Sequence, residues 1–145
     1  MPWWDRGAVD RGSASLELAV LVPALVVVLG LLVGGGRLWF ARTTVAEAAQ
    51  SAARSASLAR SADRARAEGR SAGEQSLSTA GLVCLHQDTA VDARAFGVPV
   101  GTPASIKATI TCVVPFPDLL LPGMPGTIRL TEVGTSALDT YRTRR

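Results

Sequence analysis

Apolar positions gather in one uninterrupted run near the N-terminus. No charged residue lies between Glu17 and Arg37, and the nineteen residues from Leu18 to Gly36 include six Leu and six Val. As a helix this run is about 28 Å long, which is close to the thickness of a bilayer core. The pattern therefore predicts a single transmembrane helix over Leu18–Leu38.

The run has two other interpretations. A core helix of a soluble domain is disfavoured, because such apolar runs are usually shorter than eighteen residues. A cleaved secretory signal would suit the mildly basic start at Arg6 and Arg11. The run is, however, longer than the 7–15 apolar residues typical of such signals.

The next segment has a helical pattern of a different kind. Residues 37–76 contain twelve Ala and no Pro, which favours continuation of the helix to residue 80, with fraying near Gly69 and Gly73. Five small or branched residues share one face at 4-3-4-3 spacing. This alanine seam suits packing against the chain's own sheet or against a neighbouring copy, and the sequence leaves both open; its members are Val45, Ala49, Ala52, Ala56 and Ala59.

After Gly81 the period changes to two, which is typical of strands. Ser105–Val114 alternates cleanly, and Leu82–Gln87 and Thr127–Val133 are shorter strand candidates. The loop between the last two strands carries Leu119-Leu120-Leu121. This run either packs at the sheet edge or forms an exposed contact patch, and the sequence leaves both open. The expected fold class is α+β, with a long N-terminal helix followed by a small antiparallel sheet. The expected divisions are a leader at 1–17, the span at 18–38, the helix continuation at 39–80 and a β-rich domain at 81–145.

Composition and charge exclude several classes of function. The chain is 48% hydrophobic and 19% charged, and its net charge of +3 is too small to indicate nucleic-acid binding. With one histidine and two cysteines, a four-ligand Cys/His zinc site cannot be built within one chain. His86 and Asp88 resemble no catalytic motif, and a surface His near an Asp is usually incidental. We therefore expect no enzyme, metal, cofactor or small-molecule substrate.

The two cysteines indicate the compartment. Two thiols in a small domain without metal partners predict a disulfide between Cys84 and Cys112, and hence an oxidising environment. Closing a loop of about 28 residues stabilises a domain by about 3.5 kcal/mol on the chain-entropy model. The alternative is two buried free thiols. The disulfide places the C-terminal domain outside the cell membrane and the N-terminus in the cytoplasm.

A family resemblance rests on the start of the apolar helix. The segment Arg11–Pro23, with small residues, one Glu and an early Pro, resembles the TadE-like family, as does Arg37–Ala53. These are minor pilin-like proteins of tight-adherence (Flp) pili. The resemblance implies a non-catalytic membrane protein with a pilin-like fold. Its partners would be a prepilin peptidase, other pilin-like subunits and pilus assembly proteins.

The same resemblance implies a processing site. Cleavage would follow Gly12, so that Ser13 becomes the first residue and Glu17, the assembly residue, the fifth. Flp-type pilins often place Tyr after that Glu, where this chain has Leu18. The alternative for Glu17 is a purely electrostatic role at the positive helix N-terminus.

A glycine pair lies within the predicted span. Gly30 and Gly34 form a G-x-x-x-G pair that permits close approach of two membrane helices, although glycine is common in such helices. The runner-up function is a single-pass anchored or secreted small binding domain without pilin processing.

Overall fold

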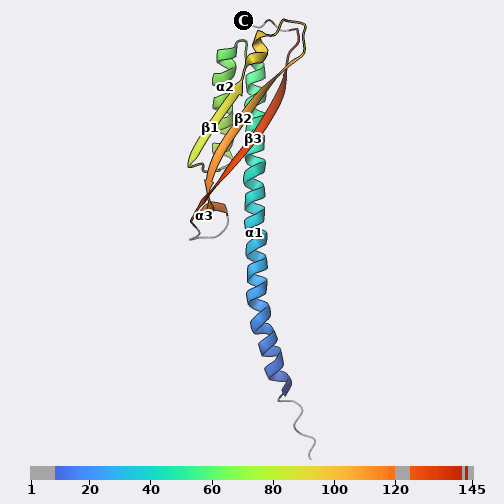
Figure 1. The fold of residues 1–145 in the computed structure, drawn as a ribbon, viewed down its shortest axis with the longest axis vertical. Helices are drawn as coiled ribbons and strands as arrows, with labels where there is room; N and C mark the ends of the chain where they lie inside the picture. Colours follow the sequence, from blue (N-terminus) through green and yellow to red (C-terminus); the bar gives the residue numbers. More distant parts are fainter. Residues whose placement is uncertain (1–8, 120–124, 142, 144–145) are drawn as a thin grey trace, which may run out of the picture.

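The computed structural model describes residues 9–119, 125–141 and 143, and for 9–15 and 118–119 the backbone alone. It confirms the α+β class. Within these residues, three α-helices, a 3₁₀ turn and three strands follow one another: α1 (Val9–Leu58), α2 (Ala62–Thr79), β1 (His86–Asp92), the turn Arg94–Gly97, β2 (Ala104–Pro115), α3 (Phe116–Leu119) and β3 (Thr127–Leu138). Figure 1 shows that the N-terminal half of α1 extends alone, while the other helices and the strands pack around its C-terminal half.

The helix was expected to continue to residue 80, and this expectation is wrong. The chain leaves α1 after Leu58, turns, and returns alongside it as α2. Ser61 caps the second helix, because its Oγ accepts a hydrogen bond from the Arg64 amide at 3.5 Å. Asp63 in the first turn adds a favourable interaction with the positive helix end. The two helices therefore form an antiparallel hairpin.

The contact between the two helices depends on small residues. Gly69 and Gly73 are buried within α2, so the expected fraying at these positions is also wrong. A Cβ on Gly69 would lie 3.1 Å from both the Ala52 carbonyl oxygen and the Ala56 Cβ. Only a residue without a side chain lets α2 approach α1 this closely.

The sheet is antiparallel throughout, in the order β1-β2-β3. The predicted strand at Ser105–Val114 is present, extended by one residue at each end. The first strand begins at His86 rather than Leu82, since pairing with β2 starts at the His86–Val113 pair. The last strand runs five residues further than expected, to Leu138. Leu120 and Leu121 of the Leu119–Leu121 run lie outside the described residues.

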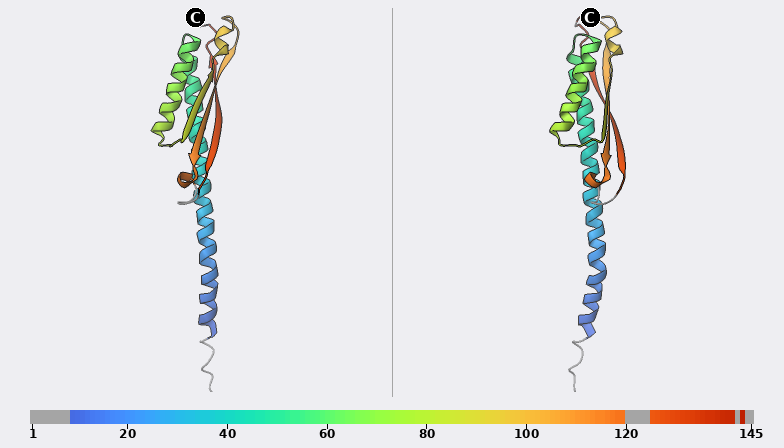
Figure 2. Two further views of the ribbon diagram at one scale, coloured as in Figure 1. Left: turned by 60° about the vertical axis from the view of Figure 1, so that its left-hand side comes forward. Right: turned by 90° about the vertical axis from the view of Figure 1, so that its left-hand side faces the viewer.

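One face of the sheet covers α1 and α2, as two views in Figure 2 show. The inward side chains of β2 are fully buried, and so is every member of the alanine seam: Ile106, Ala108, Ile110, Cys112 and Val114 from the strand, with Val45, Ala49, Ala52, Ala56 and Ala59 from the helix. The sequence left open whether the alanine seam packs against the chain's own sheet or against a neighbouring copy. In the structure it packs against the chain's own sheet and second helix.

The third strand crosses α1 at backbone distance. A Cβ on Gly134 would overlap the carbonyl group of Ala49, so no other residue fits here without moving the helix. Beside this contact the Thr135 amide donates to Gln50 Oε1 at 2.7 Å, and the Ser136 hydroxyl donates to the Ser57 hydroxyl at 3.0 Å. We call the strands, α2 and the C-terminal half of α1 (37–58) the head. The core of the head is therefore built directly onto α1.

Candidate functional site

The N-terminal half of α1 carries its apolar side chains without protein partners. All Leu and Val side chains from Leu16 to Val33 are between 49% and 70% exposed. The segment lies in a helix that is long and apolar enough to cross a membrane, and none of its most apolar window is buried. Exposure on every side is costly in water and favourable in lipid. This half of α1 is thus a candidate membrane span, as predicted.

The predicted processing residues lie near the beginning of α1. Gly12 and Ser13 have helical backbone, and Glu17 lies one turn beyond Ser13 with an exposed side chain. Positions 13 and 17 of a helix share a face and are separated by about 6 Å along the axis. Leu16, Val20 and Leu21 line a shallow surface around Glu17. The carboxylate therefore lies where the apolar part of α1 begins, among apolar side chains.

The predicted glycine pair lies in the same half of the helix. Gly30 is half-buried by its own helix and Gly34 is buried, while a Cβ on Gly30 would meet nothing within 4 Å. Among the residues that the structure describes, none packs against Gly30 closely enough to require glycine there. Its pairing with a second helix stays a prediction.

The predicted disulfide is confirmed. Cys84 and Cys112 are joined, with their Cα atoms 5.4 Å apart, and the bond ties the segment before β1 to the middle of the sheet. Cys112 is fully buried on the inner face of β2. The Leu85 amide also donates to the Val113 carbonyl at 2.8 Å, so the residue that follows Cys84 is held against β2 as well.

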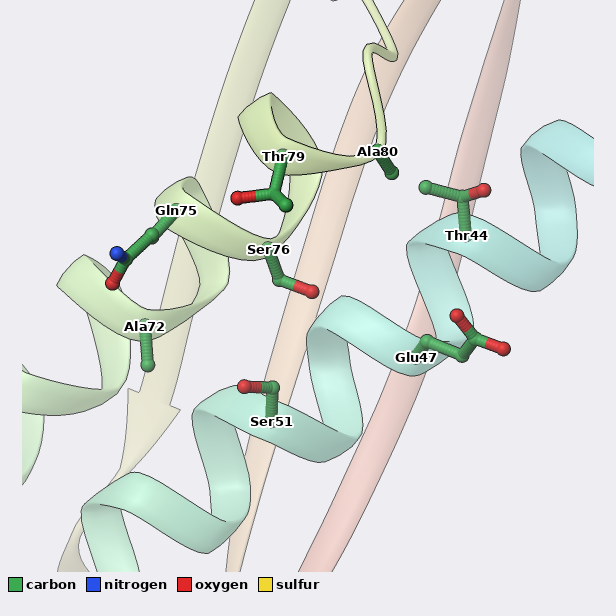
Figure 3. A pocket seen from close by; sticks show the side chains of 8 residues that line it. All are labelled: Thr44, Glu47, Ser51, Ala72, Gln75, Ser76, Thr79 and Ala80. Carbon is green, nitrogen blue, oxygen red and sulfur yellow. The ribbon is translucent and has the colours of Figure 1, made fainter.

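A polar groove of about 420 Å³ lies between α1 and α2. Figure 3 shows Thr44, Glu47 and Ser51 of α1 on one side and the end of α2 on the other. Glu47 is the one titratable side chain among the eight that line it. A lone carboxylate among hydroxyls lacks the paired groups that acid–base or nucleophilic catalysis requires.

Other titratable groups do not assemble into a site. His86 and Asp88 are both exposed on β1. Within the described residues, no three His, Cys, Asp or Glu side chains are placed to hold a metal ion. Asp92 and Arg94 form an exposed, two-pronged ion pair, and the hydrogen bonds from Arg94 lower the pKa of Asp92 to about 2. This pair stabilises the turn after β1, since the Arg94 amide also donates to Asp92.

The fold and the site together define a class: a small α+β head built on the end of a long helix whose other end is a candidate membrane anchor. Comparison with known proteins makes this more specific. The model of the TadE-like protein family matches residues 12–54, which confirms the resemblance seen in the sequence. The match covers less than a third of the chain, all of it in α1, so it shows a likeness to this family over that helix. Proteins of the TadE-like family are related to the Tad pilus and are generally non-catalytic. A search of curated proteins and a search of solved structures each found no match.

Sequence reasoning missed one part of this site. The matched segment ends at Arg54, four residues before the end of α1, so all of it lies within one continuous helix. The helix hairpin and the β3 crossing that surround its C-terminal half were not predicted. Ser61 followed by Asp63 was the available signal, because Ser with a nearby acid is a common helix start.

Proposed function

We propose that this chain is a minor pilin-like membrane protein that takes part in assembly of a tight-adherence-type pilus, without catalysing a reaction. One observation carries the proposal. The exposed apolar half of α1 leads without a break into the half that supports the head. The family match covers this same helix. A subunit built this way is held in the membrane by one end and presents a folded surface at the other.

The processing step follows from the chemistry of the helix start. Glycine is among the weakest helix formers, so Gly12 is a position where the helix unwinds at low cost to enter a peptidase cleft. Cleavage after Gly12 by a prepilin peptidase exposes an α-amine on Ser13. That amine lies one turn from the Glu17 carboxylate, on the same chain or on a packed neighbour. Their attraction strengthens as the surroundings lose water.

A carboxylate at the start of an apolar helix has a cost that a partner can offset. Charged side chains in membrane helices are rare and are usually paired. Once the leader is removed, Glu17 enters the apolar environment of a packed bundle only if a cation accompanies it. The Ser13 amine supplies that cation. In this proposal Glu17 therefore selects processed subunits for assembly.

The topology follows from the disulfide and the leader. The disulfide-bonded head lies on the oxidising outer side of the cell membrane, and Arg6 and Arg11 stay in the cytoplasm. Protease added to intact spheroplasts should therefore reach the head, whose strands span 86–138. Protection of that region would contradict the orientation.

N-terminal sequencing of the protein isolated from its native host tests the processing step. We expect a start at Ser13 in the wild type and an uncut chain in the Gly12→Ala variant. Gly36→Ala is the matched control, because a Cβ there meets nothing within 4 Å. A wild-type start at Met1 or Pro2 would indicate a plain anchor, and a start near Arg37 a secreted protein.

The assembly role of Glu17 needs a separate measurement. Glu17→Ala and Glu17→Gln should be processed normally and yet fail to co-purify with pilus assembly proteins. Glu47→Gln, which changes an exposed carboxylate in the head, is the control and should behave as the wild type. Normal pilus assembly with both Glu17 variants would contradict this role.

A further inference from the structure

The lower end of the head carries exposed apolar side chains that neither the core nor the proposed function uses. Trp39 and Phe40 on α1 are 72% and 58% exposed, and Val83 and Leu85, in the segment between α2 and β1, are 65% and 63% exposed. We call these four residues the membrane-proximal collar. Phe40 and Val83 line one groove together with Arg37. Figure 2 shows the connection from α2 to β1 passing beside α1 at this end.

The connecting segment alternates, but both of its sides are apolar. Leu82 and Cys84 turn inward and pack against the core, while Val83 and Leu85 turn outward. The disulfide at Cys84 and the hydrogen bond from the Leu85 amide to Val113 hold this orientation. The two outward side chains are therefore held on the surface by the fold itself. An extended segment facing water would ordinarily place polar residues on that side.

The collar continues the membrane span. Arg37 follows Glu17 by twenty residues, which corresponds to about 30 Å of helix and to one hydrocarbon thickness. Phe40 lies about 4.5 Å further along the same axis, at the depth of the lipid headgroups. Tryptophan and other aromatic rings concentrate at this depth in membrane proteins.

The charges around the collar have the sign that a lipid surface requires. Arg37 and Arg42 are exposed at this level. Residues 37–46 and 76–87 contain no Asp or Glu, and α3, which also lies at this end of the head, carries one acidic residue, Asp118. Cations beside apolar side chains suit the boundary between acyl chains and anionic phospholipid headgroups.

From these observations we infer that the collar is a second membrane contact, in which Val83 and Leu85 enter the headgroup–acyl boundary of the leaflet next to the head. The contact depends on α1 spanning the membrane and is independent of pilin processing. Because α1 and the 82–85 segment then touch the membrane at two separate points, the contact restricts the tilt of the molecule, since tilting away from the 82–85 side would withdraw Val83 and Leu85 from the lipid. The side of the head that carries this segment is thereby held against the membrane.

Fluorescence quenching in vesicles tests this contact. The background is the full chain with Trp3, Trp4 and Trp39 changed to Phe, reconstituted in vesicles of phosphatidylethanolamine and phosphatidylglycerol. Val83→Trp introduces the reporter, and Val133→Trp is the matched control, since Val133 is a similarly exposed valine (58%) on β3. Leu25→Trp reports on the span itself. Aqueous acrylamide and lipids brominated near the glycerol backbone are the quenchers for the two head variants, and lipids brominated near the acyl-chain ends are the lipid quencher for Leu25→Trp, which lies near the bilayer centre.

We expect brominated lipid to quench the Val83→Trp variant several-fold more than the Val133→Trp variant, with the opposite order for acrylamide. Equal quenching of the two by acrylamide, with Leu25→Trp quenched by lipid, would overturn the collar while leaving the span intact. Failure of lipid to quench Leu25→Trp would overturn both. A third outcome is Val83→Trp emission that is blue-shifted, is not quenched by lipid, and loses the blue shift on dilution into excess lipid. That outcome would mean that a second copy of the chain covers the collar, and it would overturn the inference.

Discussion

The two halves of α1 are both rich in apolar residues, yet their surroundings are opposite. From Leu16 to Val33 the Leu and Val side chains are 49–70% exposed. In the alanine seam, from Val45 to Ala59, exposure is 0–6%. The larger side chains are the exposed ones, which reverses the usual order of burial in a soluble domain.

The difference shows that side-chain size selects the partner of each half. Alanine buries little area, but it lets a second backbone approach, as α2 does at Gly69 and β3 does at Gly134. Leucine and valine would hold those backbones apart. In lipid no close approach is needed, and large side chains give the most favourable transfer free energy per residue. One helix thus contains two kinds of apolar segment: small residues where it packs against protein, and large residues where it is a candidate membrane span.

Adding one carbon atom to β3, where it touches the protein-facing half of α1, should have the largest effect on the stability of the head. Gly134→Ala places a Cβ on the Ala49 carbonyl, and the obstacle is backbone that cannot rotate away. We expect a loss of about 4 kcal/mol or more, above the usual overpacking cost of about 1–3 kcal/mol. Thermal unfolding of the head in detergent micelles measures it. Gly36→Ala, which meets no atom, should leave the melting temperature unchanged.

A charged residue in the exposed apolar half of α1 should have the next largest effect, on membrane insertion. Leu25 and Leu58 have nearly equal exposure on α1, at 59% and 63%. Leu25→Arg should disfavour membrane insertion by about 3–4 kcal/mol, whereas Leu58→Arg at the far end of the head should not change it. The fraction of protein resistant to alkaline extraction from membranes distinguishes them. Equal extraction of both variants would show that exposure at Leu25 has nothing to do with lipid.

Removing the disulfide should weaken the head and spare the anchor. The double variant Cys84→Ala, Cys112→Ala should lose about 3 kcal/mol, equivalent to a fall in melting temperature of roughly 12–24 °C for a domain of this size. Membrane extraction should be unchanged. Reduced wild-type protein should melt near the same temperature as the variant. Two labelled thiols per chain in denatured, unreduced wild type would contradict the bond.

The smallest effect concerns the exposed Asp92–Arg94 pair. Because Arg94 lowers the pKa of Asp92 from 3.8 to about 2, the pair stabilises the fold above pH 4 and loses that contribution as the pH falls from about 4 to about 2. Arg94→Ala should return the pKa of Asp92 toward 3.8, as followed by NMR of its carboxyl carbon. At neutral pH the melting temperature should change little, since exposed ion pairs contribute little to stability. An unchanged pKa in the variant would show that Arg94 is not the cause.

The strongest patterns in the sequence predicted the fold best. The charge-free run identified the exposed helix, and the strict alternation of Ser105–Val114 identified β2 with its inward face. The cysteine count identified the disulfide. The first two signals come from residues whose surroundings are uniform along the element: exposed on all sides, or core on one side.

The errors occurred where tertiary contacts outweighed local preference. Leu58-Ala59-Arg60 contains no Gly or Pro, so propensity alone favours one continuous helix, whereas packing of Gly69 and Gly73 against α1 favours the hairpin. The strand β1 was misplaced because its inward residues include Gln87 and Thr89, whose buried polar atoms give no apolar alternation. The processing residues could be named only through the resemblance, because Gly12 and Ser13 carry no structural signature of their own.

The uninterrupted course of α1 also has a mechanical consequence. Between Arg37 and Leu58 the helix extends about 32 Å into the head with no hinge, and the Gly134 and Gln50 contacts fix the sheet to it. The head and the 37–58 half of α1 therefore behave as one rigid lever, and the residues directly before it, Gly34, Gly35 and Gly36, are weak helix formers. A tilt of this rigid half by about 10° moves the far end of the head by about 5 Å, so bending at the three glycines is converted into a displacement of the head.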